Sequence, residues 1–139
     1  MRKQSALIIC IIVVLAGCAR YRSQMPSVTR ATGVVTLANG QPLRAGYIML
    51  QPVEGTTAYR EVTCPIQPDG TFALDDAGLG GVVPGTYTVI IDPDMIPPGA
   101  MPDKSANVPK KYRDASTSTL RIEVKSGALN KFELRLNAS

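Results

Sequence analysis

From Ala31 to the end of the chain, apolar and polar residues alternate in short runs. A period of two places successive side chains on opposite faces of a β-strand, whereas a helix needs apolar residues three or four positions apart. No segment after residue 30 has convincing helical spacing. The alternating runs are 33–37, 48–50, 62–66, 71–74, 87–91, 120–124 and 132–136. This pattern predicts an all-β protein, a seven-stranded antiparallel β-sandwich.

Residues that favour tight turns separate several of these runs. Gly provides the backbone freedom that hairpin turns need, and Pro, Asn and Asp stabilise turn conformations. The strongest turn signals are Asn39-Gly40, Pro68-Asp69-Gly70, Pro84-Gly85 and Ser126-Gly127. The first two predict hairpins, and the other two predict turns between successive strands.

The first 17 residues have the parts of a secretory signal: two basic residues, an apolar run and small residues before a cleavage point. The run over 6–17 is shorter than the roughly 20 residues that span a bilayer. It ends in Leu15-Ala16-Gly17-Cys18, which resembles the lipobox of bacterial lipoproteins. In that family the Cys thiol accepts a diacylglycerol and a peptidase cuts just before it. The resemblance implies that Cys18 is the lipid attachment site.

This interpretation divides the chain into a signal peptide (1–17), a lipidated Cys with its tether (18–30) and a β-sandwich domain (31–139). Two or three acyl chains would anchor the protein stably to a membrane of the cell envelope. In enteric-type sorting an Asp after the Cys retains a lipoprotein in the inner membrane. Ala19 occupies this position, which favours the outer membrane. An uncleaved anchor with an incidental Cys is the alternative.

Five segments of the domain, in order, resemble parts of carboxypeptidase regulatory-like domains, which are transthyretin-like (prealbumin-like) sandwiches. The segments are TGVVTL with NGQPL at 32–37 and 39–43, PDGTF at 68–72, VPGTYTV at 83–89, VPKKY at 108–112, and the hairpin that begins at 116–124. The last two are similar to segments of small lipoproteins abundant in planctomycete bacteria. The resemblance implies a transthyretin-like fold and a surface-exposed accessory or binding module.

The composition argues against an enzyme and against nucleic-acid binding. The chain has no His, the residue most used as a general base near neutral pH and as a metal ligand. Its net charge of +4 includes two bases of the signal segment and is too small and too scattered for a nucleic-acid surface. Hydroxyisourate hydrolases, enzymes with a transthyretin-like fold, use His residues and end in Tyr-Arg-Gly-Ser, whereas this chain ends Leu136-Asn137-Ala138-Ser139. We expect no catalytic residues and no cofactor.

Cys64 and three aspartates are the other residues with reactive or ligating side chains. Cys64 alternates with apolar neighbours, which predicts a small core residue rather than a nucleophile. It is the only Cys of the domain, so no disulfide is expected within it. Asp69, Asp75 and Asp76 offer oxygen ligands for Ca²⁺, but they lack further ligands at fixed spacing. We expect no metal site.

The connection 92–118 is long for a sandwich of short strands and contains five prolines. Loops of this length are usually functional or disordered, so it is the first place to look for a binding site. The favoured interpretation is a Pro-stiffened crossover between the two sheets, with Tyr112 packed inward as an anchor.

Together these observations predict a lipid-anchored, exported and non-catalytic module of the cell envelope. Its role would be either to bind a partner there or to support the structure of the envelope. The partner would be an envelope protein or a glycan. The alternative function is a carbohydrate- or peptidoglycan-binding surface domain, for which Tyr47 and Tyr59 are the candidate sugar-stacking rings, since their strand phase is opposite to that of the core residues.

Overall fold

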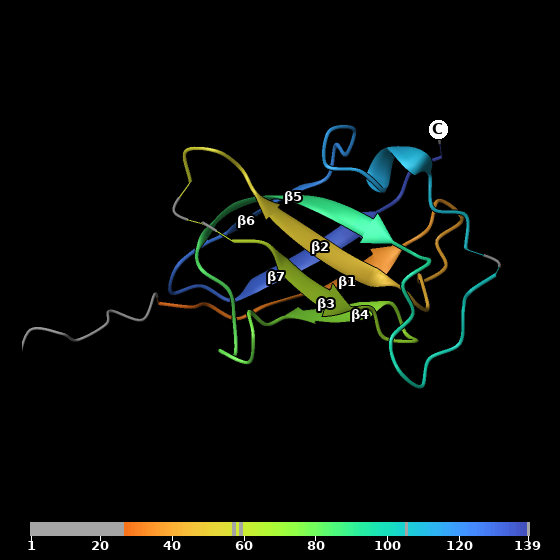
Figure 1. Ribbon diagram of the computed structural model, residues 1–139, viewed down its shortest axis with the longest axis horizontal. Coiled ribbons are helices and arrows are strands. Elements are labelled where there is room, and N and C mark those ends of the chain that lie inside the picture. Colours follow the sequence, from red (N-terminus) through yellow and green to blue (C-terminus); the bar gives the residue numbers. More distant parts are fainter. Residues whose placement is uncertain (1–26, 57, 59, 105, 139) are drawn as a thin grey trace, which may run out of the picture.

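Seven strands and one short helical turn make up the chain in the computed structural model, which describes residues 27–56, 58, 60–104 and 106–138 (Figure 1). The strands are β1 (Ala31–Thr36), β2 (Tyr47–Pro52), β3 (Val62–Pro65), β4 (Thr71–Leu74), β5 (Gly85–Asp92), β6 (Arg121–Val124) and β7 (Asn130–Arg135). The predicted all-β, seven-stranded architecture is confirmed. A 3₁₀ turn, η1 (Lys110–Tyr112), is the one helical feature of the described ranges, in a segment where no helix was expected.

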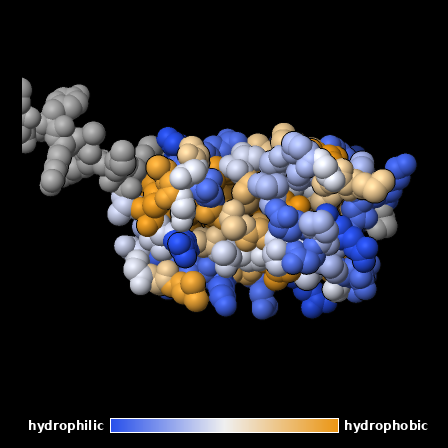
Figure 2. Space-filling view, turned by 90° about the horizontal axis from the view of Figure 1, so that it is seen from below, coloured by the Kyte–Doolittle hydropathy of each residue, from blue (hydrophilic) through white to orange (hydrophobic). Residues whose placement is uncertain are grey.

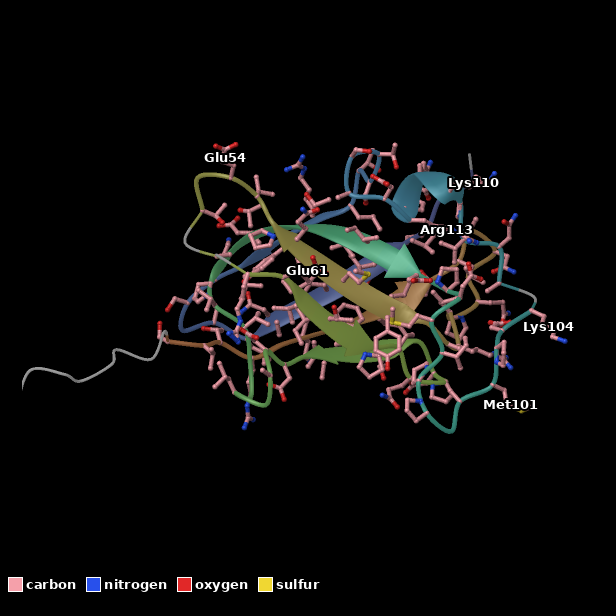
Figure 3. All side chains as sticks on the ribbon, in the orientation of Figure 1. Glu54, Glu61, Met101, Lys104, Lys110 and Arg113 are labelled. Carbon is pink, nitrogen blue, oxygen red and sulfur yellow. The ribbon has the colours of Figure 1, made fainter. Side chains whose placement is uncertain are left out.

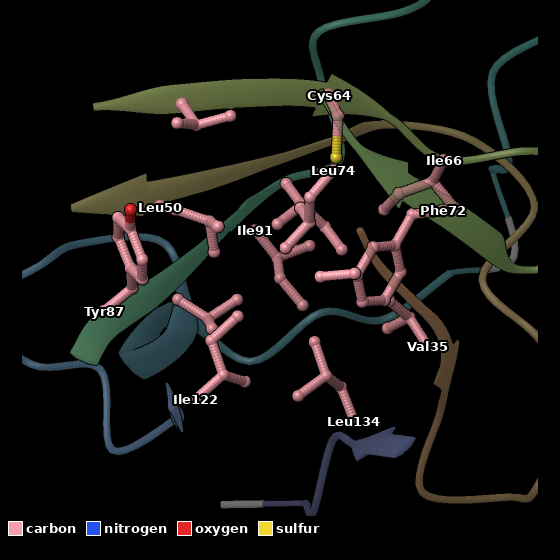
Figure 4. Packing of buried hydrophobic residues seen from close by; sticks show 14 of the residues in the cluster. Val35, Leu50, Cys64, Ile66, Phe72, Leu74, Tyr87, Ile91, Ile122 and Leu134 are labelled. Carbon is pink, nitrogen blue, oxygen red and sulfur yellow. The ribbon is translucent and has the colours of Figure 1, made fainter. Parts of the chain in front are cut away.

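The core lies between a three-stranded sheet, in the order β4-β1-β7, and a four-stranded sheet, in the order β3-β2-β5-β6. Apolar side chains at alternate positions of both sheets fill it, as Figure 4 shows for 14 of them. The clean alternation of buried and exposed residues in β4 and β6 matches the predicted period of two. Tyr87, 1% exposed, is the largest fully buried side chain, and its hydroxyl donates to the Val83 carbonyl at 2.7 Å.

One strand pairing differs from the expected antiparallel arrangement. β1 and β7 run parallel, in a register that places Ala31 opposite Asn130, whereas the other four pairings are antiparallel. The reason is that the chain crosses to this sheet from β6 of the opposite sheet, so that β7 begins at the same end of the sandwich as β1. The three-stranded sheet is therefore mixed.

The predicted hairpin turns form, but they do not join neighbouring strands of one sheet. At Asn39-Gly40 the chain turns tightly: the Leu37 N–H donates to the Gln41 carbonyl at 2.8 Å, and the Gly40 N–H donates to the Leu37 carbonyl at 2.9 Å. The strands on either side, β1 and β2, nevertheless lie in different sheets, as do β3 and β4, and β6 and β7. The expectation of hairpins, including the one at the C-terminus, was therefore wrong at the level of strand pairing.

The pairings define two ends of the sandwich. The near end, where β1 begins, carries the connections 53–61, 75–84 and 125–129. The far end, where β1 stops, carries 37–46, 66–70 and the long connection 93–120. In Figure 1 the near end lies on the left and the far end on the right, and the C-terminal segment also reaches the far end.

Candidate functional site

The predicted lipid attachment residue Cys18 and the lipobox residues Leu15, Ala16 and Gly17 lie outside the described residues. The described chain begins at Ser27, at the near end of the sandwich. Among the described residues, no helix has the length and apolar character needed to cross a membrane.

The long connection at the far end links β5 to β6, which are neighbours in one sheet. The expectation of a crossover between the two sheets was therefore wrong. The predicted anchor is confirmed, since Tyr112 is 2% exposed. Its hydroxyl accepts a hydrogen bond from the Asn137 N–H at 3.3 Å, just beyond β7 of the other sheet. The connection stays on its own sheet, but Tyr112 ties it to the end of the opposite one.

The second half of this connection is held by its own hydrogen bonds. The Ser118 hydroxyl donates to the Val89 carbonyl, and the Val89 N–H donates to the Leu120 carbonyl at 2.9 Å. The Asp114 carboxylate accepts from the Ser116 hydroxyl at 2.6 Å and from the Ser116 N–H at 2.8 Å. These two bonds hold the pKa of Asp114 below its ordinary value, and the bond from the hydroxyl has the larger effect.

Arg113 links the two halves of the connection. Its Nη1 donates to Asp94 Oδ2 at 3.1 Å, and its Nε donates to the Val108 carbonyl at 3.2 Å. Asp92, at the end of β5, accepts from the N–H groups of Asp94 and Met95 and so starts the connection with a turn. The described parts of the connection are therefore held by specific hydrogen bonds.

Segment 99–104 lies between two shallow depressions at this far end. One, of about 430 Å³, is lined by residues that include Arg44, Pro68 and Met101. The other, of about 270 Å³, is lined by residues that include Asp94, Lys104 and Arg113. Figure 3 shows Met101 and Lys104 projecting from this end, with Arg113 nearer to the sheet.

Cys64 lies in the core, as its alternation predicted, and is 3% exposed. Burial raises the pKa of its thiol to about 12. The thiol therefore stays protonated at neutral pH, and because only the thiolate is a good nucleophile, Cys64 is unsuited to nucleophilic catalysis.

The three aspartates considered as calcium ligands each have a structural role. Asp69 accepts hydrogen bonds from the N–H and hydroxyl of Thr71, which lower the pKa of its carboxyl. Asp75 accepts from the Gly80 N–H at 2.8 Å, within the β4–β5 loop. Asp76 is buried, and both its carboxylate oxygens accept from Arg60 Nε, at 2.9 and 3.0 Å. Within the described ranges, no cluster of three or more His, Cys, Asp or Glu side chains is placed to hold a metal ion.

Of the two candidate sugar-stacking rings, Tyr47 is half-buried at the start of β2. It lies opposite Pro65 of β3 and Asp92 of β5, on the outward side of the four-stranded sheet. Tyr59 falls outside the described residues. The structure thus describes one of the two rings on which the carbohydrate alternative depends, and that ring is only partly accessible.

An apolar groove of about 470 Å³ that sequence reasoning missed crosses the three-stranded sheet. Gly33 of β1, Phe72 of β4 and Phe132 of β7 contribute to its lining, with Lys131 and Glu133 along β7. The available signal was Gly33 within a predicted strand, since a Gly there often marks close approach of another group. In Figure 2, the face seen from below carries apolar surface in its middle and hydrophilic side chains along its lower margin.

Comparison of the chain with protein-family models, with curated proteins and with solved structures found no significant match in any of the three.

Proposed function

We propose that this protein is an exported bacterial lipoprotein, anchored through acyl chains on Cys18, whose β-sandwich is a non-catalytic binding or structural module of the cell envelope. Residues 1–17 are removed as a signal peptide, and residues 18–30 tether the domain to the membrane. Ala19 favours the outer membrane as the destination. The motif Leu15-Ala16-Gly17-Cys18 supports the anchor.

The observation that carries the proposal is that the two ends of the sandwich differ. The described chain begins at the near end, whereas the long connection with its exposed Met101 and its basic side chains lies at the far end. A lipid attached ahead of Ser27 would hold the near end toward the membrane. The far end, built around the buried anchor Tyr112, would then face outward, toward a partner protein or glycan.

The finer assignment of the fold is also part of the proposal. We propose a transthyretin-like sandwich of the carboxypeptidase regulatory-like kind. Three of the motif segments coincide with structural features: 32–37 includes most of β1, 83–89 leads into β5, and 108–112 ends in η1. A module without catalysis is supported by the absence of His from the sequence and by the buried, protonated thiol of Cys64.

Intact-mass analysis of protein from the membrane fraction tests the anchor, with Cys18→Ala as the matched variant. We expect a mature chain that starts at Cys18 and carries two or three acyl chains, and we expect the variant, which lacks the thiol that accepts the lipid, to lose the acyl mass. An unmodified mass, or a chain that retains residues 1–17, would refute the lipoprotein proposal.

The carbohydrate-binding alternative has weaker support, since Tyr47 is half-buried. A sedimentation assay with purified peptidoglycan tests it directly. Binding by the native protein that a Tyr47→Ala variant loses would favour this alternative over a protein partner.

A further inference from the structure

The near end of the sandwich holds the start of the described chain between two loops. The Thr29 N–H donates to the Val82 carbonyl at 2.8 Å, and the Val82 N–H donates back to the Thr29 carbonyl at 3.0 Å. On the other side, Asn130 Nδ2 donates to the Arg30 carbonyl at 3.4 Å. The chain therefore emerges between the β4–β5 loop (75–84) and the β6–β7 turn (125–129).

Each of these two loops carries an exposed leucine. Leu79 is 43% exposed and Leu129 is 75% exposed. The other large exposed apolar side chains of the described ranges, Met95 and Met101, lie in the far-end connection. Figure 2 shows apolar surface at the near end, beside the grey atoms. Single exposed leucines are ordinary, but these two lie on the loops on either side of the start of the described chain.

Local hydrogen bonds hold both leucines on compact turns. In the β4–β5 loop, the Leu79 N–H donates to the Asp76 carbonyl at 3.1 Å, and the Gly80 N–H donates to Asp75 at 2.8 Å. In the β6–β7 turn, Asn130 Nδ2 also donates to the carbonyls of Lys125 and Ala128 at 3.0 and 3.2 Å. Turns fixed in this way can present a side chain with little loss of conformational entropy.

We infer that the near end rests on the lipid surface through Leu79 and Leu129, with the exposed bases Arg30, Lys125 and Lys131 beside anionic headgroups. This inference depends on the proposed anchor at Cys18. The nine residues from Cys18 to Ser27 span at most about 30 Å, so an acylated Cys18 would keep this end close to the bilayer. Apolar side chains surrounded by basic ones are typical of segments that enter the headgroup region. The near end also carries the exposed acids Glu54 and Glu61 in the connection 53–61, so the inference depends on the two leucines and the short tether rather than on a net positive charge. Asp75 bonds to its own loop, and Asp76 pairs with Arg60.

A fluorescent probe on the full-length acylated protein in vesicles of phosphatidylethanolamine and phosphatidylglycerol tests the contact. An Ala128→Cys variant carries the probe beside Leu129, and a Met101→Cys variant carries it at the far end as the matched control. Cys64 is 3% exposed and does not compete for the label. We expect nitroxide-labelled lipids to quench the probe at position 128 about threefold more than the probe at 101, because apolar side chains of an interfacial segment enter the headgroup–acyl boundary to a depth of about 5–10 Å.

Replacing both leucines by Ser in the Ala128→Cys background should reduce quenching to the far-end level, whereas Met95→Ser leaves it unchanged. Equal quenching at positions 128 and 101, or no effect of the leucine replacements, would overturn the contact if the protein still floats with the vesicles. A second copy of the protein against this end would instead cause the probes to quench each other. This self-quenching would rise with protein density and would not respond to nitroxide, and it would also overturn the proposed membrane contact. If the protein does not float with the vesicles and Cys18 also takes up a probe, the Cys18 thiol is not acylated. That result would refute both the proposed anchor and the contact with the membrane.

Discussion

Replacing Gly33 by Ala tests the packing of the three-stranded sheet most directly. A Cβ at this position would lie 2.4 Å from Cζ of Phe72 and 2.5 Å from the backbone oxygen of Phe132, where no real contact is tolerated. Replacing a strand Gly by Ala usually stabilises a protein by roughly 0.5–1 kcal/mol. Overpacking of this kind costs about 1–3 kcal/mol, and here a backbone atom of β7 must move as well. We therefore expect a net loss of about 2 kcal/mol in the free energy of unfolding.

Urea unfolding followed by far-ultraviolet circular dichroism measures this loss. For a domain of this size the urea dependence is about 1–2 kcal/mol per molar, so the midpoint should fall by about 1–2 M. A Phe72→Leu change made with Gly33→Ala removes the ring contact but not the contact with the Phe132 oxygen, so it should restore only part of the loss. Thr32→Ala, at the exposed neighbouring position, should stay within about 0.5 kcal/mol of the native protein. An unchanged or higher midpoint for Gly33→Ala would refute the packing argument.

Three further predictions concern single side chains. Tyr112→Phe keeps the buried ring but removes the hydroxyl that accepts from Asn137, so urea unfolding should show a loss of about 1 kcal/mol. The pKa of Cys64 is raised from 9.0 to about 12, so its contribution to stability is complete below pH 9.0 and is lost as the pH rises toward 12. The stability advantage of the native protein over Cys64→Ala should therefore shrink in urea titrations at increasingly alkaline pH, and a constant difference would contradict this. The pKa of Asp69 is lowered from 3.8 by Thr71, so its contribution is present above pH 3.8 and is lost as the pH falls through the folded value. Thermal midpoints of the native protein and Asp69→Asn should converge on acidification, and parallel curves would refute the role of this carboxylate.

The alternation of apolar and polar residues was sufficient to predict the strands because each strand has one face in the core. Val62 and Cys64 of β3, and Phe72 and Leu74 of β4, point inward as their spacing predicts. Tyr112 was recognisable as an anchor because it is an aromatic residue in a polar, Pro-rich segment. The functional candidates at the near end were not recognised, since Leu79 and Leu129 are far apart in sequence and their loops come to one end because β4 and β7 both pair with β1.

The sequence by itself determined the fold class, the approximate strand positions, the turn at Asn39-Gly40 and the burial of Cys64, because each depends on local periodicity or local backbone preference. It also carries the lipobox-like motif on which the proposed location depends. The tertiary structure alone decided that β1 pairs with β7 in parallel, that turns lead from one sheet to the other, and that the long connection joins neighbouring strands. These features arise from contacts between residues distant in sequence: a turn signal states that the chain reverses, but not which strand the next one meets.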